Sequence, residues 1–318
     1  MNLNEIIQYI KTHAFHYKTD KSIYNILIGA KTHQTYFDAC SQQLLSLYHS
    51  QPHLKYTSFE RISHDNHENQ SSIPLKISTR YTFESMQQTF QVLQLLIQTI
   101  SFKQHHTLSF IPVSEISKVQ KRVKHIYYKL EQQQCLDAFK SEVYQLFELL
   151  NQVQPYALLH YFLQGYDEVM YTNQQVSLIE NLTLSELATI KMNDLVEMMH
   201  FLEDKVQFPI LHQMIILPSL SLNSKDTLKL AKNGLSLETI AQKEGVKVNT
   251  IEDHIIELYI KGYFTNYSLY LDTDNLDAFK NFYINHREER LRNFKSAFPD
   301  MSYFEIKLAI VLLAREGA

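Results

Sequence analysis

Residues 228–264, LKLAKNGLSLETIAQKEGVKVNTIEDHIIELYIKGYF, have the spacing of a helix-turn-helix. Ser236 can cap a first helix, because its hydroxyl can accept a hydrogen bond from an amide of the first turn, and Gly245 can end that helix. Asn249 can cap a second helix, with Glu252 three residues later completing a capping box. The stretch therefore predicts two short helices joined by a tight turn.

Apolar residues of the second helix recur on one face, at Ile251, Ile255 and Leu258. Three of the six glycines in the chain also fall within this stretch, where helix ends and a turn need backbone freedom. A plain helical hairpin would use the same caps. The order L-S-x-x-x-I-A followed by V-x-N-T-I-x-x-H-I favours the helix-turn-helix, because it specifies more than two capped helices.

The composition predicts an all-α protein with several domains. Only 6 glycines and 7 prolines occur in 318 residues, while residues that favour helices are abundant. A chain of this length is long enough for two or three domains. We expect an N-terminal helical domain at residues 1–110, a middle helical domain at 111–220 and a helix-turn-helix domain at 221–318.

The charge and the cysteines indicate the compartment. A net charge of -4 provides no general attraction to nucleic acid, so any such contact needs a local basic patch. The two cysteines, Cys40 and Cys135, lie among apolar residues, which is typical of buried thiols in a reducing compartment. No signal peptide is recognisable, and no apolar run approaches the roughly 20 residues of a membrane span. We therefore expect a cytoplasmic protein.

Two parts of the sequence resemble a known family. The segments GLSLETIAQKEGVKVNTIEDHIIELYIKGYF (234–264) and REERLRNFKSAFPDMSYFEIKLAIVLL (287–313) resemble the helicase helix-turn-helix domain at the C-terminus of many RecQ-type DNA helicases. The segment IYNILIGAKTHQTYFDACSQQLLSLY (23–48) resembles the opening of the YpbB family, whose members carry this domain without the helicase motor. The resemblance implies association with a RecQ-type helicase in DNA repair or replication restart.

Motifs for catalysis are missing from the sequence. It contains no G-x-S-x-G, no H-E-x-x-H and no helicase ATP motif, and residues 29–32 (GAKT) lack the glycine spacing of a phosphate-binding loop. The 15 histidines are not spaced like the four converging ligands of a zinc site. We expect no enzyme activity, no catalytic residues, no metal site and no cofactor.

The second helix of the predicted helix-turn-helix is acidic where DNA-binding versions are usually basic. Such a helix normally lies in the major groove and offers its first turns to bases and phosphates. Here we expect Glu252, Asp253, His254 and Glu257 to face the solvent, where the acids would repel phosphates. The sequence therefore predicts that these four residues bind a basic protein partner, such as the helicase.

Contact with DNA is expected at basic patches elsewhere. One helix carries five cations and no acid between residues 118 and 129, although a solvated helix face neutralised by acids elsewhere would have the same pattern. A second group follows the helix-turn-helix. The predicted nucleic-acid-binding residues are Lys118, Lys121, Arg122, Lys124, Lys129, Lys247, Arg287, Arg290, Arg292 and Lys295.

Two functions follow from these patterns. The favoured hypothesis is a non-enzymatic accessory protein that binds a RecQ-type helicase, with weak, non-specific DNA contact as a secondary property. The alternative is a transcription regulator whose helix-turn-helix binds one operator sequence. Operator binding would be favoured if Glu252, Asp253 and Glu257 turned inward or were paired, with a bare cationic face in their place.

Overall fold

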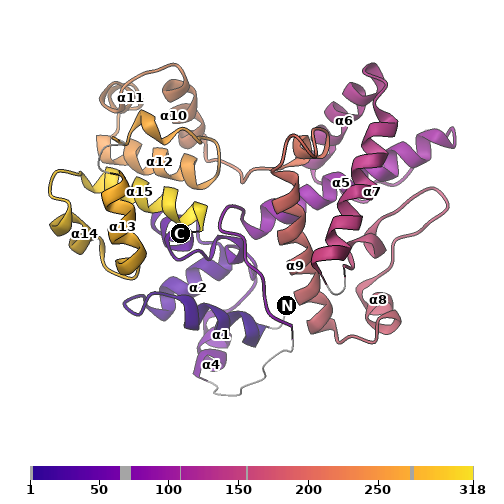
Figure 1. The fold of residues 1–318 in the computed structure, drawn as a ribbon, viewed down its shortest axis with the longest axis horizontal. Helices are drawn as coiled ribbons and strands as arrows, with labels where there is room; N and C mark the ends of the chain where they lie inside the picture. The colour runs from indigo at the N-terminus through magenta and orange to yellow at the C-terminus, as the bar shows by residue number, and fades with distance from the viewer. Residues whose placement is uncertain (1–2, 65–72, 108, 155–156, 273–275, 318) are drawn as a thin grey trace. The chain divides into compact units, whose positions relative to one another are not determined.

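The computed structural model describes residues 3–64, 73–107, 109–154, 157–272 and 276–317. These residues form fifteen α-helices and four short 3-10 helices, and no strand occurs among them (Figure 1). The all-α prediction is confirmed. The chain divides into two compact units, and the first helix, α1 (Leu3–His13), contributes residues to both.

The first unit consists of Met1–Tyr9, Asn66–Lys76 and Glu84–Ile216. In it, α9 packs against α7, α8 and a 3-10 turn, η2. The Glu142 carboxylate of α7 accepts hydrogen bonds from the amides of Ile210 (3.0 Å) and Leu211 (2.9 Å), which ties a second 3-10 turn, η3, to α7. The elements are α5 (Phe83–Gln104), α6 (Ser117–Gln132), α7 (Leu136–Val153), η2 (Leu159–Phe162), α8 (Asn173–Ile179), α9 (Leu184–Leu202) and η3 (Leu211–Met214).

The second unit joins the two ends of the sequence, because it consists of Ile10–Asp65, Ile77–Phe83 and Leu217–Ala318. Its central helix is α12, which packs against α3, α10, α11 and α15 (Figure 1). The elements are α2 (Asp20–Ile28), α3 (His33–Ser41), η1 (Leu45–Leu47), α4 (Tyr56–His64), α10 (Leu222–Lys232), α11 (Leu237–Glu244), α12 (Val248–Ile260), η4 (Tyr267–Leu269), α13 (Leu276–His286), α14 (Leu291–Ala297) and α15 (Tyr303–Glu316).

The predicted domain division at 1–110, 111–220 and 221–318 stays a prediction. The two units observed do not follow those boundaries. Residues 10–65 pack with the C-terminal hundred residues in one unit. Long-range packing of this kind leaves no mark on local composition.

The caps of the helix-turn-helix agree with the sequence in the first helix and differ in the second. The Ser236 hydroxyl accepts a hydrogen bond from the Thr239 amide (3.3 Å), and Gly245 ends α11 with a left-handed φ of 67°. The prediction that Asn249 caps α12 is wrong. That helix begins at Val248, and Lys247 occupies its cap position without a side-chain hydrogen bond, so the Asn249 backbone is already helical.

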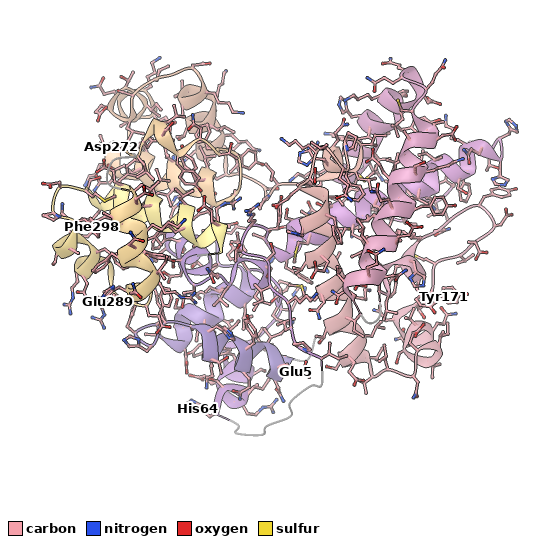
Figure 2. The ribbon with its side chains drawn as sticks, in the orientation of Figure 1. Glu5, His64, Tyr171, Asp272, Glu289 and Phe298 are labelled. Atoms are coloured by element: carbon pink, nitrogen blue, oxygen red, sulfur yellow. The ribbon has the colours of Figure 1, made fainter. Side chains whose placement is uncertain are left out.

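From residue 276 the chain forms two helices in succession. α13 ends at His286 and α14 begins at Leu291. Glu289 lies in the break (Figure 2), and its carbonyl accepts a hydrogen bond from the Tyr17 hydroxyl at 3.4 Å. The ring centroids of Phe298 and Phe279 lie 5.1 Å apart. Aromatic packing between the two segments thus takes the place of one continuous helix.

Within the described residues, no helix combines the length and apolar composition needed to cross a bilayer.

Candidate functional site

The second helix of the helix-turn-helix, α12, is largely buried. Of its 13 residues only Asn249 is exposed, and every residue from His254 to Ile260 is buried. Other helices cover it on several sides: α10 and α11 belong to the same domain, α15 follows in the sequence, and α3 comes from the N-terminal part of the chain. Only the first two turns of α12 therefore reach the surface, through the exposed Asn249 and through half-buried residues up to Asp253.

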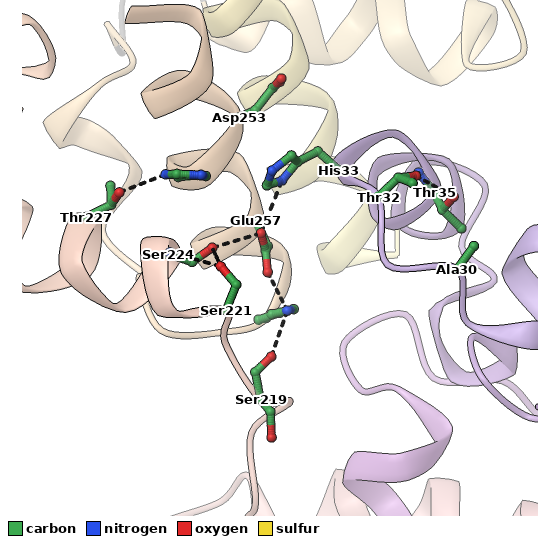
Figure 3. A network of polar contacts seen from close by, with 12 residues as sticks. Ala30, Thr32, His33, Thr35, Ser219, Ser221, Ser224, Thr227, Asp253 and Glu257 are labelled. Atoms are coloured by element: carbon green, nitrogen blue, oxygen red, sulfur yellow. Dashed lines mark hydrogen bonds and ion pairs between the residues drawn. The ribbon is translucent and has the colours of Figure 1, made fainter. Parts of the chain in front are cut away.

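α3 is positioned by a cap at its start. The Thr32 side chain accepts a hydrogen bond from the Thr35 amide (3.1 Å; Figure 3), so α3 begins with His33 directed at α12. The preceding helix ends at Gly29 with a left-handed φ of 69°. A Cβ atom at Gly29 would lie 2.5 Å from the His49 ring, so the tight approach of these segments requires glycine.

Glu257 is the centre of a polar cluster between α12 and α3 (Figure 3). Its buried carboxylate forms an ion pair with Lys261, one turn later in the chain. The His33 Nδ1 lies 3.1 Å from its Oε2, and the Ser224 hydroxyl donates to the same oxygen at 3.2 Å. Lys261 also donates to the Ser219 carbonyl (2.8 Å), so both buried charges are satisfied.

These contacts shift the pKa values of the cluster. Burial alone raises the pKa of Glu257, but the contacts from His33 and Lys261 outweigh it and lower the pKa to about 2. The contact with Glu257 in turn raises the pKa of His33, despite partial burial. The carboxylate is therefore ionised throughout the neutral range, and the imidazolium form of His33 is favoured.

His254 lies beside this cluster. Its Nδ1 is 2.8 Å from the Thr227 hydroxyl, which also donates to Glu244 at 2.9 Å. Its ring centroid lies 5.3 Å from that of His33. Burial, followed by the charge of His33, lowers the pKa of His254, so the neutral form of this histidine is favoured while His33 is protonated.

The two acids of the first turns of α12 are less buried. Asp253 forms an ion pair with Lys307 of α15 at 3.2 Å, and the Lys307 ammonium lies 5.8 Å from the ring centroid of Phe37 on α3. Glu252 is half-buried, and burial together with the charge of Asp253 raises its pKa. The negative charge of this helix is thus largely neutralised within the chain.

The prediction that Glu252, Asp253, His254 and Glu257 face the solvent is wrong for His254 and Glu257, which are 4% and 6% exposed. The reason is that α3 covers this side of α12. The partner-binding role of the four residues stays a prediction. Glu257 and Asp253 are paired, whereas Glu252 is half-buried and has no ion pair among the described residues. The surface in their place is α3 and not a bare cationic face, so the condition set for operator binding is met only in part.

Some cations of the predicted basic helix, α6, form hydrogen bonds within the protein, and others are exposed. Arg122 donates to the Gln213 carbonyl (3.0 Å) and Lys129 donates to the Gln213 side chain (2.8 Å), so both hold η3 against α6. Lys118 is half-buried, whereas Lys121 and Lys124 are exposed. Two of the five predicted phosphate contacts therefore already have a structural role.

The C-terminal cations are similarly divided. Lys295 donates to the carbonyls of Pro299 (2.7 Å) and Met301 (2.8 Å) and so holds the turn after α14. Arg287 donates to Gln43 at 3.5 Å, and the Arg290 guanidinium lies 5.5 Å from the Tyr17 ring. The exposed cations of the predicted set in this unit are Lys247, Arg290 and Arg292.

Sequence reasoning missed the residues that complete the Glu257 cluster. The spacing of Glu257 and Lys261 is the i, i+4 spacing of a helical ion pair, which was a usable signal. His33 gave no such signal, because it meets Glu257 only through the fold.

Exposed lysines on α10 and α11 also belong to the surface of the helix-turn-helix: Lys225, Lys229, Lys232 and Lys243.

Comparison with known proteins supports the assignment of the C-terminal part. A family model described as a helix-turn-helix domain matches residues 223–310. The chain is similar to Protein YpbB of Bacillus subtilis (strain 168), with 24% identity over 226 residues. That match covers 69% of this chain and 63% of YpbB, so the chain spans less than two thirds of the relative's length. No solved structure matches the chain. The helix-turn-helix prediction is confirmed, and the link to a helicase stays a prediction.

Proposed function

We propose that this chain is a cytoplasmic, non-enzymatic accessory protein that binds a RecQ-type DNA helicase and supports DNA repair or recombination, with weak, sequence-blind DNA contact as a secondary property. The resemblance of residues 234–264 and 287–313 to the C-terminal domain of such helicases supports the choice of partner. The matching of residues 223–310 by a helix-turn-helix family and the similarity to YpbB support the same class of protein.

The burial of α12 is the observation that carries the proposal. A groove-reading helix needs an exposed face over its first two turns, so that several side chains can reach base edges. Here Asn249 alone is exposed, and α3 covers His254 and Glu257. The lack of an exposed face, rather than repulsion of phosphates, disfavours groove reading by α12, because Glu257 is paired with His33 and Lys261 and Asp253 is paired with Lys307.

The surface left on the helix-turn-helix fits non-specific contact with DNA. Lys229 and Lys232 lie in the last turn of α10, Lys243 lies in the last turn of α11 and Lys247 precedes α12, and all four are exposed. Flexible lysines neutralise phosphates without reading bases, so binding of this kind is weak and falls steeply with salt.

Co-purification tests the partner. The tagged protein, recovered from its own cells under mild salt, is expected to bring down a RecQ-type helicase, and the helicase should remain after nuclease treatment because the contact is between proteins. A Lys229→Glu and Lys232→Glu double variant serves as the control for indirect recovery through DNA. Absence of a helicase, or its loss on nuclease treatment, would refute the proposal.

A fluorescence titration separates this function from that of a transcription regulator. The accessory protein should bind random duplexes weakly and lose affinity steeply with salt, without a preferred sequence. A regulator should instead bind one sequence about 10³-fold or more tightly than random duplex. Selection from a random duplex library that converged on one operator would favour the regulator.

A further inference from the structure

A cavity in the first unit combines aromatic rings with lysines. It has a volume of about 440 Å³ and lies between α5, α6 and the segment that joins them. Residues 95, 99 and 103 of α5 line one wall at helical spacing, and residues 123, 124, 127 and 128 of α6 line the other. This volume falls within the usual range of about 300–1,000 Å³ for pockets that hold a small ligand.

Three aromatic rings line the cavity at different depths. The Tyr127 ring is buried, and its hydroxyl donates to Glu131. The Tyr128 ring is 63% exposed, and Phe110 is half-buried with its ring centroid 4.8 Å from that of Phe102. Ile111, 88% exposed, adds apolar surface next to Phe110. The exposed ring of Tyr128 offers a π-face on which a flat ligand can stack.

The charge of the cavity is positive. Lys103 and Lys124 line it, Lys121 is exposed one turn before Lys124 on α6, and no aspartate or glutamate is among the lining residues, all of which the structure describes. The Lys103 ammonium lies 5.2 Å from the ring centroid of Tyr127. Within the described residues none of these three lysines forms an ion pair, so their charges are available to an anion. Glu131, the nearest acid on α6, is occupied by Tyr127.

We propose that this cavity binds single-stranded nucleic acid, with one unstacked base against the ring of Tyr128 and the adjoining phosphates on Lys124 and Lys121. A ligand that is both aromatic and anionic matches the rings and lysines together. A duplex does not, because its bases are stacked inward and cannot enter a pocket of this size. The proposal gives the DNA contact of the proposed function a definite site, and rests on that function only in this respect.

Matched pairs of exposed residues test the site. Tyr128→Ala removes the stacking ring, and Tyr144→Ala, at a residue 72% exposed on α7, is the control for losing a surface tyrosine. Lys124→Glu reverses a charge of the cavity, and Lys205→Glu reverses an exposed lysine that does not line it. All four side chains are at the surface, so the variants should fold, which circular dichroism checks.

Fluorescence anisotropy of the full chain with labelled oligothymidine, oligouridine and a duplex measures the effect. The wild type should bind the single strands more tightly than the duplex. Tyr128→Ala should weaken binding about 5-fold or more, the range found for loss of one stacked base. Lys124→Glu should weaken it and reduce the salt slope by about 0.7, as for one lost phosphate contact. Both controls should stay within about 2-fold of the wild type.

Two outcomes would overturn the proposal: equal or tighter binding of the duplex, and equal losses in Tyr128→Ala and Tyr144→Ala. Oligothymidine and oligouridine differ in the sugar and in the 5-methyl group of the base, so a preference between them shows which of the two strands the site favours and supports the site in either case. The result is separable from that of the helicase test. Variants of the cavity that lose single-strand binding should still recover the helicase, and failure to recover a helicase would leave the cavity result unchanged.

Discussion

At the scale of single residues, the cluster around Glu257 decides how the helix-turn-helix is held. A carboxylate and an ammonium taken out of water stabilise a fold only when each meets its partner. Glu257 meets Lys261, His33 and Ser224, and Lys261 also meets the Ser219 carbonyl. Replacing Glu257 alone should therefore destabilise the fold more than replacing Glu257 and Lys261 together.

Glu257→Ala is expected to lower the free energy of unfolding by about 3–5 kcal/mol, because it leaves the Lys261 ammonium buried and unpaired. The double variant Glu257→Leu with Lys261→Met should lose less free energy of unfolding, because it leaves no unpaired buried charge. Urea unfolding followed by circular dichroism measures both. Asp226→Ala, at an exposed acid of α10, is the control and should change stability little. A single variant as stable as the control would show that the buried pair contributes nothing.

The two histidines give the stability a pH dependence of known sign. The pKa of His33 is raised above 6.5, so its contribution is fully present below that value and is lost as pH rises through the raised pKa. In His33→Asn this loss disappears, so the stability difference between wild type and variant should shrink from about pH 6 to about pH 8. Urea midpoints at several pH values measure it.

His254 and Glu257 change the stability of the protein in the opposite direction with pH. The pKa of His254 is lowered, so its contribution is present above 6.5 and is lost as pH falls. The contribution of Glu257 is present above 4.5 and is lost only as pH falls toward about 2. Subtracting the variant from the wild type removes the contributions that do not depend on His33 and leaves those of His33 and of its contacts with Glu257 and His254. The exposed His53→Asn serves as control. A difference that grows with pH would contradict the assigned contact between His33 and Glu257.

At the scale of elements, the two helices of the helix-turn-helix start in different ways. α11 has a side-chain cap at Ser236, and α12 has none, because Lys247 occupies the cap position. The start of α12 is instead held by packing, since Ile251 is buried in its first turns. We therefore expect substitution of the polar residue at the helix start to reduce stability in α11 and to have little effect in α12.

Ser236→Ala is expected to lower stability by about 1 kcal/mol through loss of the hydrogen bond to the Thr239 amide. Asn249→Ala should change stability by no more than about 0.5 kcal/mol, because its exposed side chain makes no capping contact. Thermal unfolding of the two variants side by side makes the comparison. A loss of similar size in Asn249→Ala would mean that the side chain caps α12 in solution.

At the scale of the whole molecule, the unit that contains the helix-turn-helix is assembled from both ends of the chain. The C-terminal segment provides α10 to α15, and the N-terminal segment provides α3, which packs against both α12 and α15. Without α3, the buried charges of Glu257 and Lys261 would be left next to solvent and lose the contact with His33. The helix-turn-helix thus depends on residues far away in the sequence.

A fragment of residues 217–318 is accordingly expected to be less stable than the same residues in the full chain, with faster amide hydrogen exchange in α12. Co-expression with a fragment of residues 10–65 should restore protection, because it supplies α3. Hydrogen exchange read by mass spectrometry measures both. A fragment as protected as the full chain would instead support the predicted separate domain at residues 221–318.

The helices and the helix-turn-helix could be predicted from short stretches of sequence. The caps at Ser236 and Gly245, and the i, i+4, i+7 spacing of Ile251, Ile255 and Leu258, depend on neighbours within a few residues, so they can be read from the chain. The wrong cap at Asn249 was predicted by the same local rules and missed the observed cap position, Lys247, by two residues, because a helix start is set by packing as well as by capping.

Which helix faces remain at the surface depends on how distant parts of the chain pack together. Helical periodicity places Glu257 and His254 on one face of α12, but an acidic face pointing to solvent and an acidic face covered by α3 have the same local pattern. His33 reaches Glu257 because two ends of the chain pack together, and Gln213 engages Arg122 and Lys129 in the same manner. Contacts between residues distant in sequence depend on the burial of whole helices, which no short stretch of sequence specifies.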